Sequence, residues 1–569
     1  MPAHLARVCV AVAWGAVAAC ACVGCWGGSG PGQHVGATDA DCVRGLDAAR
    51  EGDAHRPGDL PSGVDVRLPG ELSTDPDGSC PVDDCRNVDG AGPGDTFLEE
   101  EVVAVEPGFH AVWSLTLGGE AADRGVIVRA LDDGSMVLAG ESDSAQFAAG
   151  GLAFDKPFPD VWSWDVFVAS LDAYGNAAWG ELLGGSANDS VNGLSVAADG
   201  TIYVACNYES PDFAFAGAVL PHSGDFDLLL MALDADGAAL WSLAAGGPSM
   251  DVAFGVAAAP EGGVYLTGFI GSDGVDLGTG PLEHSGADGI PDGFLAKLTA
   301  DGSVAWAESF GGAGSEVPRT VTMAPDGNVV LIGSFESPTL LLGETALKNR
   351  GGSDIFVATF TPDGEVAWAK AWGGLEHDAP HAVALTPAGS IVVTGSYQSY
   401  DLDFGGGKLP NASAPGYHDM FLLALAPDGT HLWSKGFGGV GWDLGKALAV
   451  AADGTLWLGG SFSSPQLVLG TALAGPQDEE TNASDMFLAR FSGDGTPLAE
   501  AAFSGNGMDY AYFLSPAPDG SVLVTGFFDS SPSNAATDPG PLDLGNGPLP
   551  QLGAIDVLLA RLAPGEGGP

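Results

Sequence analysis

Short apolar runs of four to seven residues alternate with turn dipeptides along the chain from about residue 109 onward. In the stretch 354–397, Phe356, Ala358 and Phe360 recur at every second position, which is the period of a β-strand and not of a helix. The runs are bounded by Asp-Gly or Pro-Asp-Gly, and these dipeptides favour tight turns because Gly readily adopts positive φ. The pattern predicts strands joined by hairpin turns.

The same unit recurs seven times. Six tryptophans, each followed by a Gly-Gly pair, mark it at intervals of 62 to 66 residues: Trp113, Trp179, Trp241, Trp306, Trp368 and Trp433. A seventh copy is degenerate, with Leu498 in place of Trp and Gly505-Asn-Gly507 in place of the pair. A fixed period of this length indicates one supersecondary unit used many times.

Each unit contains four predicted strands, A to D, so the fold class is all-β: a seven-bladed β-propeller of four-stranded antiparallel blades. The repeats begin with a D-type strand at residues 110–117 and end with a C-type strand at 557–562. We therefore expect the N-terminal strand to complete the last blade, which closes the ring and removes an exposed sheet edge. The repeated tryptophans are expected to pack between blades.

The regions outside the repeats divide the chain into four parts. We expect a lipoprotein-type signal at 1–25, a disordered Gly-, Asp- and Pro-rich linker at 26–95, the propeller at 96–563 and a tail at 564–569. Val17-Ala18-Ala19-Cys20 resembles a bacterial lipobox, so Cys20 is the expected lipid attachment site, with Cys25 as a poorer alternative. Acyl chains there would tether the protein to the cell envelope, as an outer-membrane lipoprotein or at the cell surface.

The formal net charge is −55, from 74 acidic and 19 basic residues. This charge argues against binding to nucleic acid or to anionic lipid, so we expect contact with the membrane only through the lipid. It favours cations or basic partners, although acidity also simply keeps a secreted protein soluble. We expect a monomer.

Two positions in each unit are nearly always acidic. One follows Gly-Gly and opens strand A: Asp123, Asp189, Asp251, Glu316, Asp378, Asp443 and Asp509. The other opens strand C: Asp165, Asp227, Asp292, Asp354, Asp419, Asp485 and Asp556. Strand direction alternates within a blade, so both sets lie on one face, and the first set should ring the mouth of the channel.

Two interpretations of the first acidic set remain open. Asp at a strand entry commonly accepts backbone N–H bonds, and seven copies would fix seven loops. Alternatively the carboxylates hold Ca²⁺, the one cofactor we expect if there is any, because Ca²⁺ prefers oxygen ligands. A second stretch with calcium-like composition is the Asp-rich segment 75–85, which also contains Cys80 and Cys85.

The same face carries the B-to-C connections, of roughly 20–28 residues, whose length is typical of functional or partly structured loops. A Leu-x-Leu-Gly phrase recurs in them, as at 340–343 and 467–470, and predicts that they pack onto the blades. Their variable tips are the expected binding surface for a protein or glycan. No catalytic motif for a metalloprotease, nucleophile elbow, P-loop or dinucleotide fold is present, so we assign no catalytic residue.

The recurring pattern Asp-x-Phe-x-Ala-x-Leu/Phe, Asp-Gly, Trp, Gly-Gly-x-x-x-Asp, Asp-Gly and Thr-Gly-x-Phe resembles the bacterial SBBP β-propeller repeat over roughly residues 109–562. The resemblance implies an envelope lipoprotein with a propeller and says little about activity. Three functions follow as hypotheses: a binding or scaffold module, an enzyme (hydrolase or lyase) with a Ca²⁺-assisted site at the channel mouth, and a structural surface protein without a specific ligand.

Overall fold

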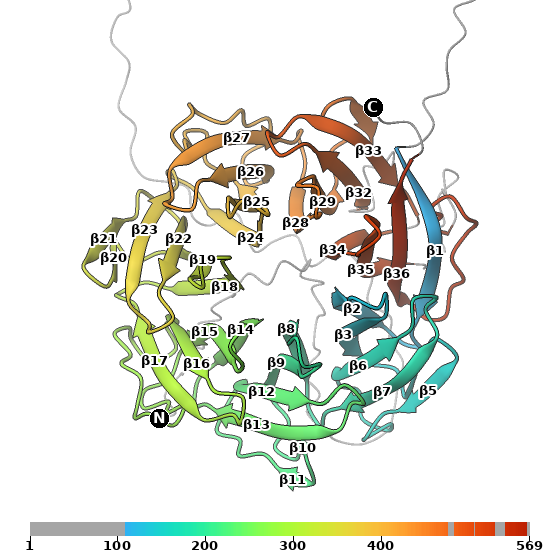
Figure 1. Ribbon diagram of the computed structural model, residues 1–569, viewed down its shortest axis with the longest axis vertical. Helices are drawn as coiled ribbons and strands as arrows, with labels where there is room; N and C mark the ends of the chain where they lie inside the picture. The colour runs from blue at the N-terminus through green and yellow to red at the C-terminus, as the bar shows by residue number, and fades with distance from the viewer. Residues whose placement is uncertain (1–107, 476–482, 506, 530–540, 566–569) are drawn as a thin grey trace, which may run out of the picture. The chain divides into compact units, whose positions relative to one another are not determined.

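A computed structural model describes residues 108–565, except 476–482, 506 and 530–540. Within these ranges the chain is all-β, and seven four-stranded antiparallel sheets form the blades of a propeller (Figure 1). The described residues include no helix long and apolar enough to cross a membrane. The signal segment with Cys20, the linker with its Asp-rich stretch, and most of the tail lie outside the described residues.

The innermost strand of each blade, strand A, lines the centre of the ring (Figure 1). These strands are β2 (Asp123–Ala130), β8 (Asp189–Val196), β14 (Asp251–Ala258), β18 (Glu316–Met323), β24 (Asp378–Leu385), β28 (Asp443–Val450) and β34 (Asp509–Pro516). Strand B of each blade pairs with it: β3 (Met136–Ser142), β9 (Ile202–Tyr208), β15 (Val264–Ile270), β19 (Val329–Phe335), β25 (Ile391–Tyr397), β29 (Leu456–Phe462) and β35 (Val522–Asp529). We number the blades 1 to 7 in this order.

Strand C follows outward: β6 (Asp165–Leu171), β12 (Asp227–Leu233), β16 (Asp292–Leu298), β22 (Asp354–Phe360), β26 (Asp419–Leu425), β32 (Asp485–Phe491) and β36 (Ile555–Pro564). Strand D forms the rim: β7 (Ala177–Leu183), β13 (Ala239–Ala245), β17 (Val304–Phe310), β23 (Val366–Trp372), β27 (His431–Phe437), β33 (Pro497–Phe503) and β1 (Phe109–Leu117). Strands B and C are almost wholly buried because each blade is covered on both faces by its neighbours.

The predicted closure is confirmed. Strand β1 pairs antiparallel with β36, from Phe109 opposite Pro564 to Leu117 opposite Val557, so blade 7 combines both ends of the repeat region (Figure 1). The core consists of seven large apolar clusters, one at each junction between adjacent blades. The ring is therefore held by burial between blades, and closure completes the junction that would otherwise leave β36 as an open edge.

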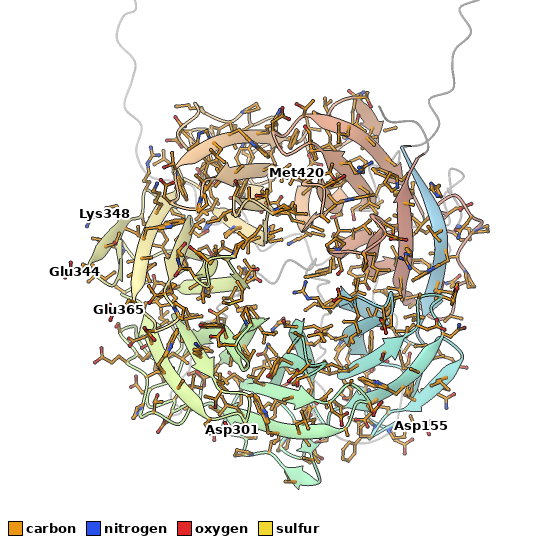
Figure 2. The ribbon with its side chains drawn as sticks, viewed as in Figure 1. Asp155, Asp301, Glu344, Lys348, Glu365 and Met420 are labelled. Carbon is orange, nitrogen blue, oxygen red and sulfur yellow. The ribbon has the colours of Figure 1, made fainter. Side chains whose placement is uncertain are left out.

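Several B-to-C connections carry a small hairpin outside the blade: β4 (Gln146–Ala149) with β5 (Leu152–Asp155), β10 (Ala214–Phe215) with β11 (Ala218–Val219), β20 (Thr339–Leu342) with β21 (Thr345–Lys348), and β30 (Gln466–Val468) with β31 (Ala472–Ala474). As predicted, the Leu-x-Leu phrases pack down: Leu340, Leu342 and Leu467 are at most 1% exposed. The charged side chains of Glu344, Lys348 and Glu365 lie at the rim (Figure 2).

The packing role of the tryptophans is also visible. Each of the six donates its indole N–H to a carbonyl in the C-to-D turn of the next blade, as Trp179 Nε1 does to Ala235 O at 2.9 Å. The ring lies against that turn's glycine, since a Cβ on Gly237 would come within 2.7 Å of Trp179. These contacts lock each blade onto the next one.

The prediction that Leu498 takes the place of the Trp in the seventh repeat was wrong. Leu498 does not occupy the Trp position, because Trp433 pairs with Ala424 and the equivalent residue in blade 6 is Ala499, opposite Arg490. Leu498 instead matches the exposed residue that precedes each Trp. Blade 7 has no C-to-D turn for a Trp to cover, because its strand D comes from the N-terminal side. The chain passes there instead, and a Cβ on Gly108 would lie 2.5 Å from the Cβ of Ala499.

Candidate binding face

The carboxylates that open strand A are buried, and backbone N–H groups surround them. In six blades the second glycine of the Gly-Gly motif, or Gly505 in its degenerate form, donates to the acid four residues later, as Gly439 does to Asp443 at 2.7 Å. In the remaining blade Glu316 accepts the N–H of Ser337 at 3.1 Å, and the backbone of Gly312 also acts on it. These are the bonds that the loop-fixing interpretation requires.

A serine that the sequence analysis missed completes this arrangement. It lies 21 residues after the acid in six blades: Ser144, Ser210, Ser272, Ser337, Ser399 and Ser464. Its hydroxyl accepts an N–H from the turn before strand A in all six, and in blade 6 Ser464 also donates to Asp443 at 2.6 Å. The constant spacing was the available signal, and in blade 7 it falls on Ser530, outside the described residues.

The carboxylates that open strand C bind the ends of the B-to-C connections. Asp227, Asp292, Asp354, Asp419 and Asp556 each accept an N–H from the loop residues just before them, with Asp354 receiving that of Arg350 at 2.9 Å. In Asp227, Asp292, Asp354 and Asp419 the second oxygen is buried without a hydrogen-bond partner. That oxygen lies against the first glycine of Gly-Gly: a Cβ on Gly373 would be 2.0 Å from Asp354 Oδ1. In these blades a side chain at the glycine would meet the acid, whereas in blade 6 Ser504 stands at this position and donates its hydroxyl to Asp485 at 3.0 Å.

The two acidic sets meet at the junctions, because the strand C acid of one blade lies next to the strand A acid of the following blade. Burial is the main cause that raises their pKa values, and repulsion between neighbours such as Asp354 and Asp378 adds to it. The pKa is raised to about 7 for Asp165, Asp189, Glu316 and Asp419, and to about 6 for Asp227, Asp354, Asp378 and Asp485. Hydrogen bonds to the charged form oppose the shift without cancelling it.

The predicted calcium ligands Asp123, Asp189, Asp251, Glu316, Asp378, Asp443 and Asp509 do not converge, since each belongs to a different blade. Across residues 108–565, outside the gaps, no three His, Cys, Asp or Glu side chains form a group that could hold a metal ion. The calcium role stays a prediction, while the hydrogen bonds that fix the loops are present.

Above these fixed bases, aromatic side chains are exposed on the face where strands A and C begin, which we call the loop face. Tyr400, Tyr417 and Trp442 are 55%, 40% and 44% exposed, and the rings of Tyr417 and Trp442 are 5.6 Å apart. The Tyr400 hydroxyl donates to Ser413 O, and Ala414 donates to Val440 O, which links the two loops. We call Tyr400, Tyr417, Val440 and Trp442 the aromatic patch.

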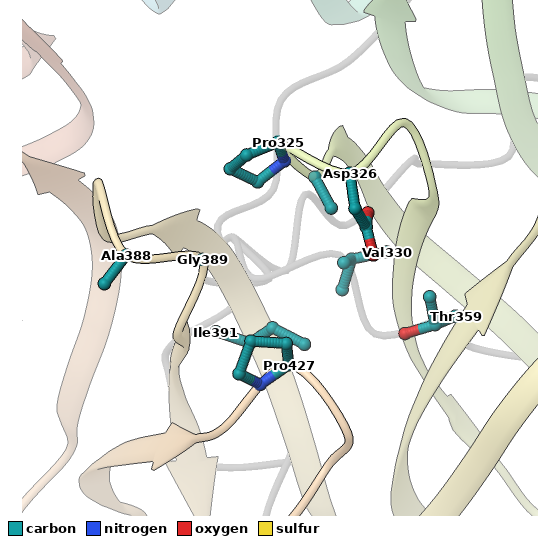
Figure 3. Close-up of a pocket in the computed structure, with 9 residues that line it drawn as sticks. Pro325, Asp326, Val330, Thr359, Ala388, Gly389, Ile391 and Pro427 are labelled. Carbon is teal, nitrogen blue, oxygen red and sulfur yellow. The ribbon is translucent and has the colours of Figure 1, made fainter.

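The opposite face, which carries the tight turns, offers a pocket between blades 4 and 5 (Figure 3). Its lining is mostly apolar and includes Pro325, Ile391 and Pro427. Its one acidic side chain, Asp326, accepts the N–H of Asn328 within its own turn at 3.0 Å. The pocket is therefore a depression between two turns and holds no set of convergent polar groups.

Comparison with known proteins gives no family. No model of a known protein family matches the sequence. The chain is 24% identical to the regulatory protein FlaEY of Caulobacter vibrioides over 232 residues, which is 38% of this chain and 23% of that protein. It is 19% identical to an uncharacterised WD repeat-containing protein, L264, of Acanthamoeba polyphaga mimivirus over 443 residues, 65% of this chain and 32% of the other. It thus spans about a quarter to a third of these relatives.

Solved structures show the same kind of fold at low similarity. A protein of unknown function from Dyadobacter fermentans matches 81% of this chain and 100% of its own, with a TM-score of 0.38 and 11% identity. A gluconolactonase from Xanthomonas campestris matches 65% of this chain and 85% of its own, with a TM-score of 0.30 and 14% identity. At these levels the likeness concerns the fold only.

The contact between strand C acids and glycine can be tested in blades 5 and 6. A Cβ on Gly438 would lie 2.3 Å from Asp419 Oδ1, so Gly438→Ala should lower the free energy of unfolding by about 1–3 kcal/mol. Gly493→Ala, where the nearest atom would be 3.4 Å away, is the matched control and should change it by less than about 0.5 kcal/mol. Urea denaturation measures both variants. Combining Gly438→Ala with Asp419→Ala should give less than the sum of the single effects, whereas additivity would contradict the contact.

Stability should also depend on pH in an unusual direction. The junction carboxylates have pKa values of about 6 to 7 in the fold, above those of the unfolded chain, so the folded state binds more protons between pH 4 and 7. Their contribution is full at low pH and is lost as pH rises through the folded pKa values. We expect the free energy of unfolding to fall from pH 5 to pH 8. Repeating the titration in about 1 M salt screens the exposed charges, and a stability that is flat or rising with pH there would contradict this origin.

Proposed function

We propose that the protein is a binding module whose ligand lies on the loop face at the aromatic patch. The observation that carries this proposal is the contrast between fixed loop bases and exposed aromatic tips. Carboxylate and serine bonds hold the base of each loop, whereas Tyr400 and Trp442 stay about half exposed. Tyr and Trp on a rigid support supply large contact area at low entropic cost, which is the usual composition of a binding hot spot.

The partner that this surface suits is a protein or a glycan. Aromatic rings can pack against apolar side chains or against the flat face of a sugar, and the phenol and indole groups offer hydrogen bonds. The net charge of −55 would repel the phosphate backbone of nucleic acid, so we do not propose a nucleic-acid partner. We propose that the protein acts as a monomer.

The enzyme alternative is a hydrolase or lyase with a Ca²⁺-assisted site at the channel mouth. It depends on the ring of strand A carboxylates, and six of the seven accept the N–H of the glycine four residues earlier. A carboxylate already engaged in this way has fewer oxygen lone pairs for a metal. The geometry therefore favours binding over this chemistry.

We also propose that the protein is an SBBP-type repeat lipoprotein of the cell envelope, anchored through Cys20. The repeated motif and the lipobox-like residues 17–20 support this. Two acyl signals or more are needed for stable anchoring, and a lipidated N-terminal cysteine supplies several chains at once. Such an anchor would present the propeller outside the cytoplasm.

The aromatic patch gives a test of the binding role. Sedimentation of the purified protein with washed envelope from the producing cells measures its affinity. Trp442→Ala and Tyr417→Ala should each weaken binding about tenfold, because hot-spot aromatics contribute more than 1 kcal/mol each. Tyr174→Ala is the matched control, since Tyr174 is 79% exposed in the C-to-D turn of blade 1, on the opposite face. Equal affinity of wild type and Trp442→Ala would overturn the proposal, and pretreating the envelope with protease or glycosidase distinguishes the two ligand classes.

The anchor has a separate test. Cys20→Ser should abolish incorporation of labelled palmitate and move the protein from the membrane fraction to the soluble fraction. Cys25→Ser should leave both unchanged if Cys20 carries the lipid. Labelling that persists in Cys20→Ser and disappears in Cys25→Ser would assign the anchor to the other cysteine.

A further inference from the structure

Every strand A contains the same irregularity. Its register with strand B shifts after the third residue, which leaves the fourth residue unpaired in a β-bulge. The unpaired residues are Val126, Asn192, Phe254, Arg319, His381, Lys446 and Tyr512. A bulge redirects a side chain away from the regular pleat. Strand A is innermost in each blade (Figure 1), so these seven residues occupy equivalent positions on the strands that surround the channel, and we call them the channel ring.

Three consecutive members of the ring are basic: Arg319 in blade 4, His381 in blade 5 and Lys446 in blade 6. They occupy the same bulge position on three neighbouring strands A. Burial is the main cause that lowers the pKa of His381, and Lys446, Arg319 and His418 add to it electrostatically. An aromatic residue flanks the three at either end. The Arg319 guanidinium lies 5.3 Å from the ring centre of Phe254 in blade 3, and Tyr512 occupies the next position in blade 7.

These three basic side chains lack an acidic partner. Within the described ranges no ion pair involves Arg319, His381 or Lys446, and the buried Nε of Arg319 has no hydrogen-bond partner. His381 contacts only a hydroxyl, with Nε2 3.0 Å from Ser396 Oγ. Burial, with Arg319 as the second cause, lowers the pKa of Lys446 to about 7. The three side chains are partly buried, and an unpaired charge with restricted access to water is unfavourable, so this arrangement is unfavourable when empty.

Acidic residues are absent from the same wall, although the chain has 74 of them. No strand A contains Asp or Glu after its first residue. The first-residue carboxylates are held by backbone N–H groups at the channel mouth. Glu141 of strand β3 interacts electrostatically with Arg124 on strand A of blade 1. This pair belongs to blade 1 and not to blades 4 to 6.

We propose that Arg319, His381 and Lys446 form a binding site inside the channel for an oxyanion, the carboxylate or phosphate group of a small organic molecule. Arginine and lysine together recognise such groups through charge-assisted N–H···O bonds. The ring of Phe254, 5.3 Å from the Arg319 guanidinium, borders the charged arc at one end. The site lies below the loop face and shares no residue with the aromatic patch.

The test uses isothermal titration of the full chain with citrate and with inorganic phosphate in a buffer of low ionic strength. Arg319→Met and Lys446→Met remove one charge each at similar volume, and each should weaken binding at least about tenfold, the loss expected for one charge-assisted bond. Lys348→Met is the control, because Lys348 lies on the exposed hairpin strand β21 at the rim (Figure 2). It should bind like wild type. Comparing citrate with phosphate shows which group the site takes.

Thermal unfolding adds a readout that a merely structural role would not give. Without anion, Lys446→Met should melt at the same or a higher temperature than wild type, because it removes unpaired charge. With citrate or phosphate, wild type and Lys348→Met should gain melting temperature, and Lys446→Met should not. No binding of either anion to wild type at about ten millimolar, or an equal loss in Lys348→Met, would overturn the site.

Discussion

A buried carboxylate pressed against a glycine at the blade junctions is the constraint on which the loop face depends. The strand C acid holds the end of the B-to-C loop, and its other oxygen fills the space where the Gly-Gly turn would carry a side chain. The strand A acid of the next blade accepts the turn's own N–H. Loop, turn and two blades are thus joined at one point. In blade 6 Ser504 takes the place of the glycine and donates its hydroxyl to Asp485 at 3.0 Å, so a side chain there is accommodated by a hydrogen bond to the acid.

Closure of the ring also depends on contacts between neighbouring blades. Each Trp requires a C-to-D turn on the next blade to receive its indole N–H, and blade 7 cannot offer one because its strand D is β1. The position that would hold the seventh Trp is Ala499, whose small side chain leaves space for the chain at Gly108. A ring whose last blade combines both ends of the repeat region therefore requires this degenerate repeat.

Much of this could be predicted from the sequence. The Trp, Gly-Gly and Asp-Gly landmarks recur at visible intervals, and they gave the blade count, the closure and the face that carries the acids. The serine 21 residues after the acid was missed because serine is common and its partner is distant in sequence. The residue opposite Arg490 was misplaced because Leu498, a large apolar residue, resembles the Trp of the other blades more than the small Ala499 does. The channel ring stayed hidden because no residue type marks the bulge in strand A.

The sign of the charged side chains changes with their distance from the centre of the ring. This distribution relates the acidity of the chain to the character of its channel. Exposed acids such as Asp155 and Asp301 lie on the rim, where water solvates them (Figure 2). Acids at the junctions are buried against N–H donors, and their raised pKa values show that burial outweighs these bonds. Further inward, strand A carries Arg124, Arg319 and Lys446 and no acid after its first residue. A closed ring concentrates the field of whatever lines it, so a chain with 74 acids can offer an anion a favourable site only where its own carboxylates are kept out.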